Sequence, residues 1–383
     1  MRRVWLAGWM ALVLGGGFMS VSSAMAQDDP APEAGAQEAP AATPEAQDPS
    51  PAVEDPAAQE GPEGDPFERL YTQWNELAAQ AKAKAEEFAQ AGPDDRDAVR
   101  TSYNEIVGQM EQLLPELRAA AFARYEAEEA PDEELTKLVI GMLINDAVAG
   151  RADQLLEEGE LLIEKRCPRE LLERAVKAPR LGLFTREALE ELLLRYDEAV
   201  ADDLPRVKIT TAKGEIVVEL FENEAPNTVA NFISLAEKGS YNGSTFHRVL
   251  DNFVAQGGMV TDTDDGDPGY TIKCECYQEN YRHHYQGSLA MAKTQARDSG
   301  NSQFYLVMER NATVANLDGN YTVFGRIVSG IEVLDLITRR DPAKENQPEV
   351  GDTIVSVEVL RKRDHEYVPV TIARPEAPAA PGN

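Results

Sequence analysis

Hydrophobic residues recur at helical spacing over the stretch from residue 67 to about residue 200. The first stripe advances in steps of three and four residues and consists of Phe67, Leu70, Trp74, Leu77 and Ala81. Pro115 interrupts the pattern, and we expect one helix to end there and another to begin. Because the links between the helices are short, neighbouring helices should run antiparallel. The pattern predicts an α-helical module over 66–202, either a bundle or a degenerate helical-hairpin repeat.

From Pro205 onward the hydrophobic pattern alternates with a period of two residues. Residues 206–221 read as two strands around a Lys-Gly turn, and several more short strands follow, among them YTIKCEC at 270–276, up to 353–363. Two helices are expected among these strands, at 225–239 and 330–337. This order predicts a closed antiparallel barrel or a sandwich over 205–363. The remaining residues, 364–383, are rich in proline and alanine and are expected to be disordered.

The first 26 residues have the composition of a secretory signal peptide. Arg2 and Arg3 precede an apolar, glycine-interrupted stretch that ends in the small-x-small sequence Ala24–Ala26. An uncleaved membrane anchor is the alternative. Residues 27–65 hold 11 acidic residues and 8 prolines but no Lys or Arg, which predicts a disordered linker. We therefore expect an exported chain, periplasmic or secreted, without stable membrane insertion after cleavage.

The charge of the chain limits its partners. The 383 residues include 37 basic and 67 acidic side chains, for a formal net charge of −30. Such a chain is repelled by nucleic acid and by anionic membranes. Nucleic acid is therefore not an expected partner.

Cysteine and histidine give weak signals for a metal site. The three cysteines are Cys167, Cys274 and Cys276, an odd number that does not form a disulfide framework. The C-x-C pair could be unpaired structural thiols or, in an oxidising compartment, a bridge. Zinc would need two further ligands. His283 and His284 are adjacent and are expected to be exposed loop residues, so no metal is predicted.

Three polar residues stand within the apolar strands: Arg248, Gln256 and Gln303. Buried polar side chains must be paired, so each could simply belong to a satisfied polar cluster at a barrel rim. The sequence contains no G-x-S-x-G nucleophile motif and no phosphate-binding glycine loop. The candidate chemistry is therefore one that needs neither a nucleophile nor a phosphate.

Four segments together resemble the cyclophilins, a family of peptidyl-prolyl cis-trans isomerases. These segments are FHRVLDNFVAQGG, GSLAMA, NSQFYLVM and NLDGNYTVFGRIV, and the resemblance runs from about Val207 to Arg361. It implies an eight-stranded antiparallel barrel with two helices, in agreement with the strand pattern. It also implies proline-containing polypeptides as substrates. Rotation about a prolyl bond breaks no covalent bond, so no cofactor is expected.

The resemblance assigns roles to individual positions. It implies that Arg248 is catalytic, that Gln256 orients Arg248, and that His247 is a neighbouring site residue. The remaining positions would hold the proline ring and the flanking peptide, and they are Phe253, Val254, Ala292, Gln303, Tyr305, Leu317 and Tyr321.

The chain departs from the family pattern at three of the aligned positions. Tyr305 replaces the commoner phenylalanine, which adds a hydroxyl that needs a partner. Val254 replaces a common methionine. Asn316 stands where drug-sensitive members have tryptophan, so we expect weak cyclosporin binding.

We expect an exported isomerase that acts on folding or resident envelope proteins. One alternative is a proline-segment binding module or scaffold with a weak active site. Another is a holdase chaperone in which the helical module binds clients. The helical module could also recruit a protein partner of its own.

Overall fold

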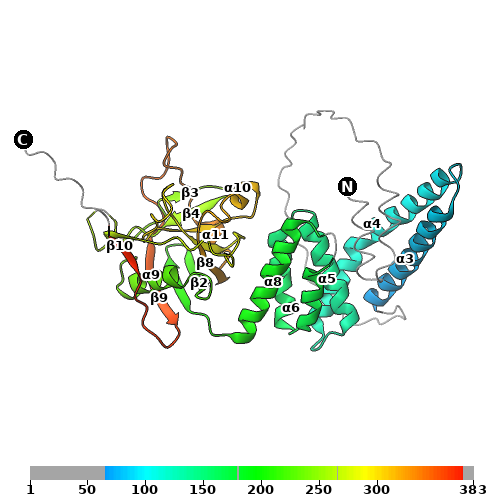
Figure 1. The fold of residues 1–383 in the computed structure, drawn as a ribbon, viewed down its shortest axis with the longest axis horizontal. Helices are drawn as coiled ribbons and strands as arrows, with labels where there is room; N and C mark the ends of the chain where they lie inside the picture. Colours follow the sequence, from blue (N-terminus) through cyan, green and yellow to red (C-terminus); the bar gives the residue numbers. More distant parts are fainter. Residues whose placement is uncertain (1–64, 179–180, 265, 374–383) are drawn as a thin grey trace, which may run out of the picture. The chain divides into compact units, whose positions relative to one another are not determined.

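The computed structural model describes residues 65–178, 181–264 and 266–373 (Figure 1). The expected signal peptide, nearly all of the 27–65 linker and residues 374–383 lie outside this part. The chain divides into two compact units, with the boundary between Asn145 and Asp146. Among the described residues no helix combines the length and the apolar character needed to cross a membrane.

The first unit is built on a helical hairpin of α3 (Pro66–Gln90) and α4 (Arg96–Ala127), which pack along each other (Figure 1). The side chain of Asp65 caps α3 by accepting a hydrogen bond from the Phe67 N–H, and Pro66 occupies the first turn. The predicted stripe of apolar residues on α3 is buried. Helix α5 (Glu133–Val148) follows and crosses the unit boundary.

The prediction that a helix ends at Pro115 is wrong, because α4 continues through this residue. Proline lacks the N–H that would bond the carbonyl four residues earlier, so it normally breaks a helix. Here Leu113 and Leu117 on either side are buried, while Pro115 itself is exposed. Burial of the apolar face therefore outweighs the local cost of the proline.

The second unit begins with three helices, α6 (Ala152–Glu164), α7 (Arg169–Val176) and α8 (Leu183–Ala201). Helix α8 packs against both α6 and α7. These helices were expected to belong to the helical module over 66–202. By packing, they form one compact unit with the strands that follow.

The strands of the second unit form an eight-stranded antiparallel sheet with the order β3-β4-β7-β6-β8-β2-β1-β9. Backbone hydrogen bonds join Gly243 and Phe246, before β3, to Ile354 and Asp352 at the start of β9, so the sheet curls toward closure. Its members are β1 (Arg206–Thr211), β2 (Gly214–Leu220), β3 (Arg248–Val249), β4 (Val254–Gly257), β6 (Ser288–Met291), β7 (Phe304–Val307), β8 (Val323–Ser329) and β9 (Ile354–Arg361).

The fold confirms the predicted eight-stranded barrel-like sheet and the helical region before it. Helix α9 (Pro226–Glu237) packs its apolar face into the main core, where Phe232 meets Phe304 and Phe324. The second expected helix is short, α11 (Val333–Leu336), and a further short helix, α10 (Ala312–Ala315), was not predicted.

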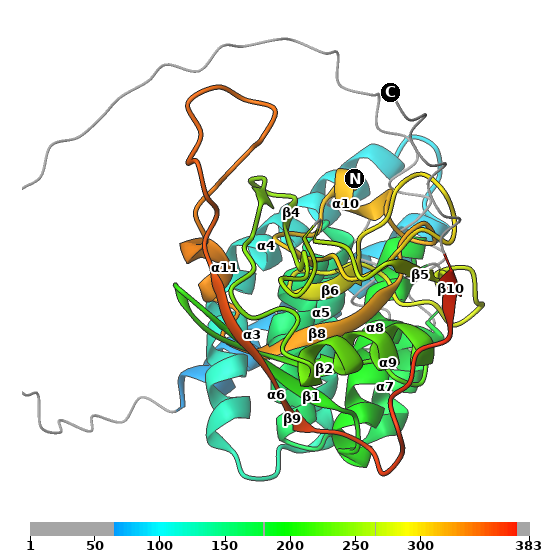
Figure 2. The ribbon, with the colours of Figure 1, turned by 90° about the vertical axis from the view of Figure 1, so that its left-hand side faces the viewer.

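The expectation that residues 364–383 are disordered is wrong for residues 364–373. Strand β10 (Thr371–Ala373) pairs with β5 (Tyr270–Ile272), and the two lie side by side in Figure 2. Tyr367 is buried, and its hydroxyl donates to Glu222. Alternating apolar residues at 368, 370 and 372 carried the strand signal within this proline-containing segment.

Candidate active site

The catalytic candidates lie on one face of the sheet because of the strand register. Arg248 on β3 pairs directly with Gln256 on β4, and Gln256 pairs with Tyr305 on β7. Tyr305 in turn pairs with Ala290 on β6. Directly paired residues project to the same face of a sheet, and so do residues two positions apart. Val254, two residues before Gln256, therefore also lies on this face.

The opposite face of the same strands forms the main core. The intervening residues Ala255, Leu289, Phe304 and Leu306 all belong to the large buried cluster around α9. The two-residue alternation thus separates the core from the candidate site. A slip of one residue in the register would move Arg248 and Gln256 into the core.

The polar side chains of the site are half-buried and connected. The Gln256 Nε2 donates to Gln303 Oε1 at 3.0 Å, which links β4 to the segment before β7. The backbone carbonyl of Gln303 accepts from the Ala292 N–H at 2.9 Å. The Arg248 guanidinium lies 5.7 Å from the centre of the Phe253 ring. Phe253 therefore restrains one side of the guanidinium.

A second, smaller apolar cluster lies beside these polar groups. It includes the buried side chains of Val254 and Tyr305, and four half-buried side chains pack against it: Phe253, Ala292, Leu317 and Tyr321. The Tyr305 and Tyr321 rings meet edge to face, with 6.0 Å between their centres. The structure thus brings together the five residues whose side chains were assigned to the proline pocket, and it places Ala292, the predicted backbone contact, beside them.

The extra hydroxyl of Tyr305 is hydrogen-bonded. Its oxygen lies 2.8 Å from His284 Nε2, and His284 Nδ1 lies 2.7 Å from Asp318 Oδ1. Since Asp318 is an acceptor when ionised, the His284 proton belongs on Nδ1 and the tyrosine hydroxyl donates to Nε2. Arg310 donates to Asp318 Oδ2 at 2.8 Å. Tyr305, His284, Asp318 and Arg310 thus form a continuous row of hydrogen-bonded side chains, the His284 row.

The expectation that His284 is an exposed loop residue is wrong, because its side chain is fully buried. A buried imidazole needs a partner on each nitrogen, and Asp318 and Tyr305 supply them. The unusual tyrosine was visible in the sequence, but its partner, 21 residues earlier, was not identified. His283 is half-buried and also bonds Asp318.

Burial, hydrogen bonds and neighbouring charge shift the pKa values of His284 and Asp318. Burial lowers the pKa of His284 despite the opposing effect of Asp318. For Asp318 burial acts to raise the pKa, but hydrogen bonds from His283 and His284 and the charge of Arg310 outweigh it and lower the pKa. A neutral imidazole thus lies between an ionised carboxylate and a neutral phenol.

His247 lies beside Arg248 in the chain but in different surroundings. Its carbonyl accepts a hydrogen bond from Arg340, and burial lowers the pKa of its imidazole, with further lowering from Arg340 and Arg248. Within the described residues no hydrogen bond joins the His247 ring to Arg248 or Gln256. Its role in the site stays a prediction.

A buried ion-pair network holds α8 to the loop that carries the two histidines. Arg282 is 2% exposed and donates to both carboxylate oxygens of Glu191, at 3.0 and 2.8 Å, and also to Glu198. Its guanidinium also lies 3.7 Å from the centre of the Phe221 ring. The positive charge of Arg282 lowers the pKa of Glu191 to about 2, although burial alone would raise it. The network fixes the chain two residues before His284.

Among the residues that the structure describes, no group of three or more His, Cys, Asp or Glu side chains could hold a metal ion.

Comparison of the amino-acid sequence with known proteins identifies the family of the second unit. Residues 206–359 match the family model "Cyclophilin type peptidyl-prolyl cis-trans isomerase/CLD". A peptidyl-prolyl cis-trans isomerase of Helicobacter pylori is 48% identical over 135 residues, which is 35% of this chain and 80% of the relative. Peptidyl-prolyl cis-trans isomerase B of Bacillus subtilis is 46% identical over 131 residues, 34% of this chain and 88% of the relative. The chain belongs to the cyclophilin family of peptidyl-prolyl cis-trans isomerases.

Proposed function

We propose that Arg248 accelerates prolyl isomerisation by stabilising the twisted imide. The planar imide is held by resonance, which imposes a barrier of roughly 18–20 kcal/mol. When the bond twists, the prolyl nitrogen regains a lone pair. A guanidinium that donates to this nitrogen stabilises the twisted state more than either planar state, and only such a difference raises the rate.

The observation that supports this role is the register of Arg248 against Gln256 beside the smaller apolar cluster. One charge-assisted hydrogen bond formed only in the transition state could contribute about 3 kcal/mol, on the scale of a single oxyanion-hole donor. Phe253 and the Gln256–Gln303 bond restrict the motion of the polar groups. The guanidinium then needs little rearrangement as the bond twists.

The apolar residues would bind the proline ring while the peptide chain rotates. Tyr305 can take part because its hydroxyl is already bonded to His284, which leaves the ring as an apolar surface. Gln303 and the Ala292 backbone, which are joined by a hydrogen bond, would hold the flanking peptide. This arrangement supports proline-containing polypeptides as substrates.

A protease-coupled assay with a proline-containing tetrapeptide tests the proposed activity. The full chain should accelerate the cis-to-trans step in proportion to enzyme concentration. A matched control is Arg100→Ala, which removes an arginine on α4 in the first unit and should leave the rate unchanged. Binding of the peptide without acceleration would instead identify a proline-segment binding module.

We also propose that the chain is exported and acts on envelope proteins. The motivation is the signal-peptide pattern of residues 1–26 followed by the acidic stretch 27–65. Fractionation of cells that produce the full chain tests this. Export predicts that the extracytoplasmic form begins near Gln27, and retention of the uncleaved chain in the cytoplasm would refute it.

A further inference from the structure

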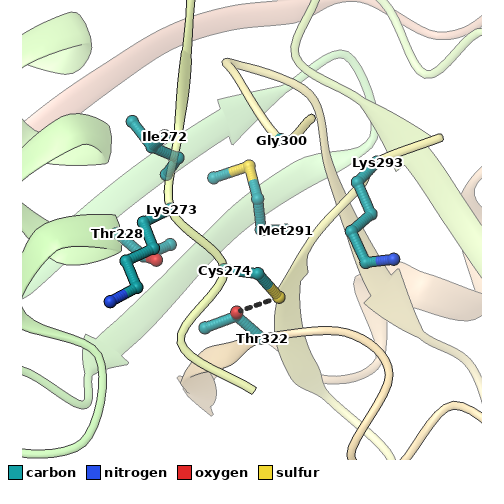
Figure 3. Close-up of a pocket in the computed structure, with 8 residues that line it drawn as sticks. All are labelled: Thr228, Ile272, Lys273, Cys274, Met291, Lys293, Gly300 and Thr322. Carbon is teal, nitrogen blue, oxygen red and sulfur yellow. Dashed lines mark hydrogen bonds between the residues drawn. The ribbon is translucent and has the colours of Figure 1, made fainter. Parts of the chain in front are cut away.

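The two cysteines of the C-x-C sequence have their sulfur atoms in contact. Cys274 Sγ lies 2.8 Å from Cys276 Sγ, and Cys274 Sγ also lies 3.4 Å from Thr322 Oγ1 (Figure 3 shows the latter contact). Both residues follow the end of β5 at Ile272, so the strand expected over this segment is shorter than predicted. In a strand the i and i+2 residues would be too far apart for easy bridging. The turn brings their side chains together instead.

Several hydrogen bonds fix the backbone of this turn. The Cys274 N–H donates to Asp298 Oδ1 at 2.9 Å, and the Glu275 N–H donates to Thr322 Oγ1 at 3.0 Å. The Glu275 carboxylate accepts from the backbone N–H groups of Asn227 and Thr228 at the start of α9. The turn is thus held from three sides, and the contact between the sulfurs is part of a restrained structure.

The two thiols differ in access. Cys276 is 1% exposed, whereas Cys274 is half-buried. Cys274 also lines an open hollow of about 550 Å³ together with Lys273, Tyr277 and Arg297. Cys274 is therefore the cysteine that faces an approaching disulfide, and the buried Cys276 sulfur lies in contact with the Cys274 sulfur.

The electrostatic surroundings favour the same division of roles. The hydrogen bond from Cys276, with smaller contributions from Thr322 and Lys293, lowers the pKa of Cys274 to about 6. The interaction with Cys274, together with burial, raises the pKa of Cys276. A thiolate is the attacking species in disulfide exchange.

We propose that Cys274 and Cys276 form a thiol–disulfide exchange site that takes small disulfides as its substrates. The Cys274 thiolate attacks one sulfur of RS–SR, so that a Cys274–SR bond forms and RS⁻ leaves. Cys276, after giving up its proton to solvent, attacks the Cys274 sulfur and displaces the second RS⁻. Two protein thiols and RS–SR thereby become one intramolecular disulfide and two RSH, with the small disulfide as the oxidant.

The test uses the purified, reduced full chain and oxidised glutathione as the probe, followed by alkylation and mass spectrometry of the peptides. In the wild-type chain the C-x-C peptide should be two hydrogens lighter, as an intramolecular disulfide requires, and should carry no glutathione. Cys167, which is buried near α7, should still be found as the alkylated thiol. Cys276→Ser should accumulate one glutathione on Cys274. Cys274→Ser should react at least tenfold more slowly at Cys276.

The control variant is Cys167→Ser, which should behave as the wild type. The rate at which the wild-type chain releases the first glutathione should change less than about threefold between pH 7 and 8.5, because this step uses only the Cys274 thiolate, which is already formed. Failure of Cys276→Ser to take up glutathione, or equal rates at Cys274 and Cys276, would overturn the proposal. A wild-type chain that ends as a stable glutathione adduct would also overturn it, because Cys276 would not then resolve the adduct.

The inference is independent of the isomerase proposal. Arg248→Ala should retain the full exchange rate, and Cys274→Ser should retain isomerase activity within about twofold. Far-UV and near-UV circular dichroism spectra of the same samples show whether each variant is folded. An unfolded variant should lose both reactions. A folded variant that loses both reactions would contradict the independence of the two sites.

Discussion

At the scale of single residues, the site is explained by how each polar group is paired. Tyr305 carries a hydroxyl into a buried apolar cluster, and His284 and Asp318 satisfy it. The sequence could predict Arg248, Gln256 and the apolar positions, because a family resemblance fixes them one by one. It could not predict the His284 row, because that row joins residues from separate loops whose proximity depends on the fold.

Tyr305→Phe should destabilise the second unit by about 1–3 kcal/mol, because it leaves the buried Nε2 of His284 without its donor. Isomerase kcat/KM should change less than about threefold, since the aromatic ring is kept. Urea unfolding and the peptide assay measure the two effects. Tyr321→Phe, at a half-buried ring, is the matched control, and equal stability of the two variants would contradict this explanation.

The stability contributed by His284 should depend on pH. Its folded pKa is lowered, so as pH falls below about 6.5 the unfolded chain takes up the proton before the folded chain does. The contribution is therefore complete above about pH 6.5 and declines below it. His283 has a raised pKa and acts in the opposite direction, so the wild type alone is not informative.

The comparison needed is between the wild type and His284→Gln, with the free energy of unfolding measured from pH 5 to pH 8. The difference in the free energy of unfolding between the two proteins should shrink as the pH falls below 6.5. A difference that grows toward low pH would show that His284 is protonated in the folded protein.

At the scale of elements, periodicity identified most helices and strands but not their limits. The helical pattern predicted a break at Pro115, yet α4 continues because Leu113 and Leu117 are buried on either side. The strand before the C-x-C sequence ends at Ile272, which the apolar run did not reveal. Both errors arise where tertiary contacts outweigh local preference.

Helix α8 is attached to the sheet through buried charges, which makes Arg282 critical for stability. Arg282→Met should cost about 3–5 kcal/mol, because it leaves Glu191 and Glu198 buried without their main cation. Chemical denaturation measures the loss. Lys362→Met removes a lysine whose partner, Glu237, is exposed, and should cost less than about 1 kcal/mol. Similar losses in both variants would contradict the importance of burial.

At the scale of the whole molecule, the sequence predicted that a helical region precedes a β region. The boundary between the two regions was predicted only from the change in hydrophobic periodicity near residue 205. Helices α6–α8 belong by packing to the unit that contains the sheet. Their contacts include Asp153 with the backbone of Gln286 and Arg310, and Glu160 with Arg326. Contacts between residues more than a hundred positions apart leave no mark in the local hydrophobic pattern.

A fragment of residues 146–373 should therefore fold cooperatively and retain isomerase kcat/KM within about twofold. A fragment of residues 203–373 loses Glu191 and Glu198, which pair with Arg282, and Glu160, which pairs with Arg326, and it should unfold at a clearly lower temperature. Differential scanning calorimetry compares the two. Equal melting temperatures would show that α6–α8 contribute nothing to the stability of the sheet.

If the Arg248 guanidinium stabilises the twisted prolyl bond, as we propose, kcat/KM of Arg248→Ala should fall at least tenfold. This fall is equivalent to about 1.4 kcal/mol of transition-state stabilisation, and the unfolding curve should be unchanged. A folded Arg248→Ala protein with the isomerase activity of the wild type would contradict this proposal.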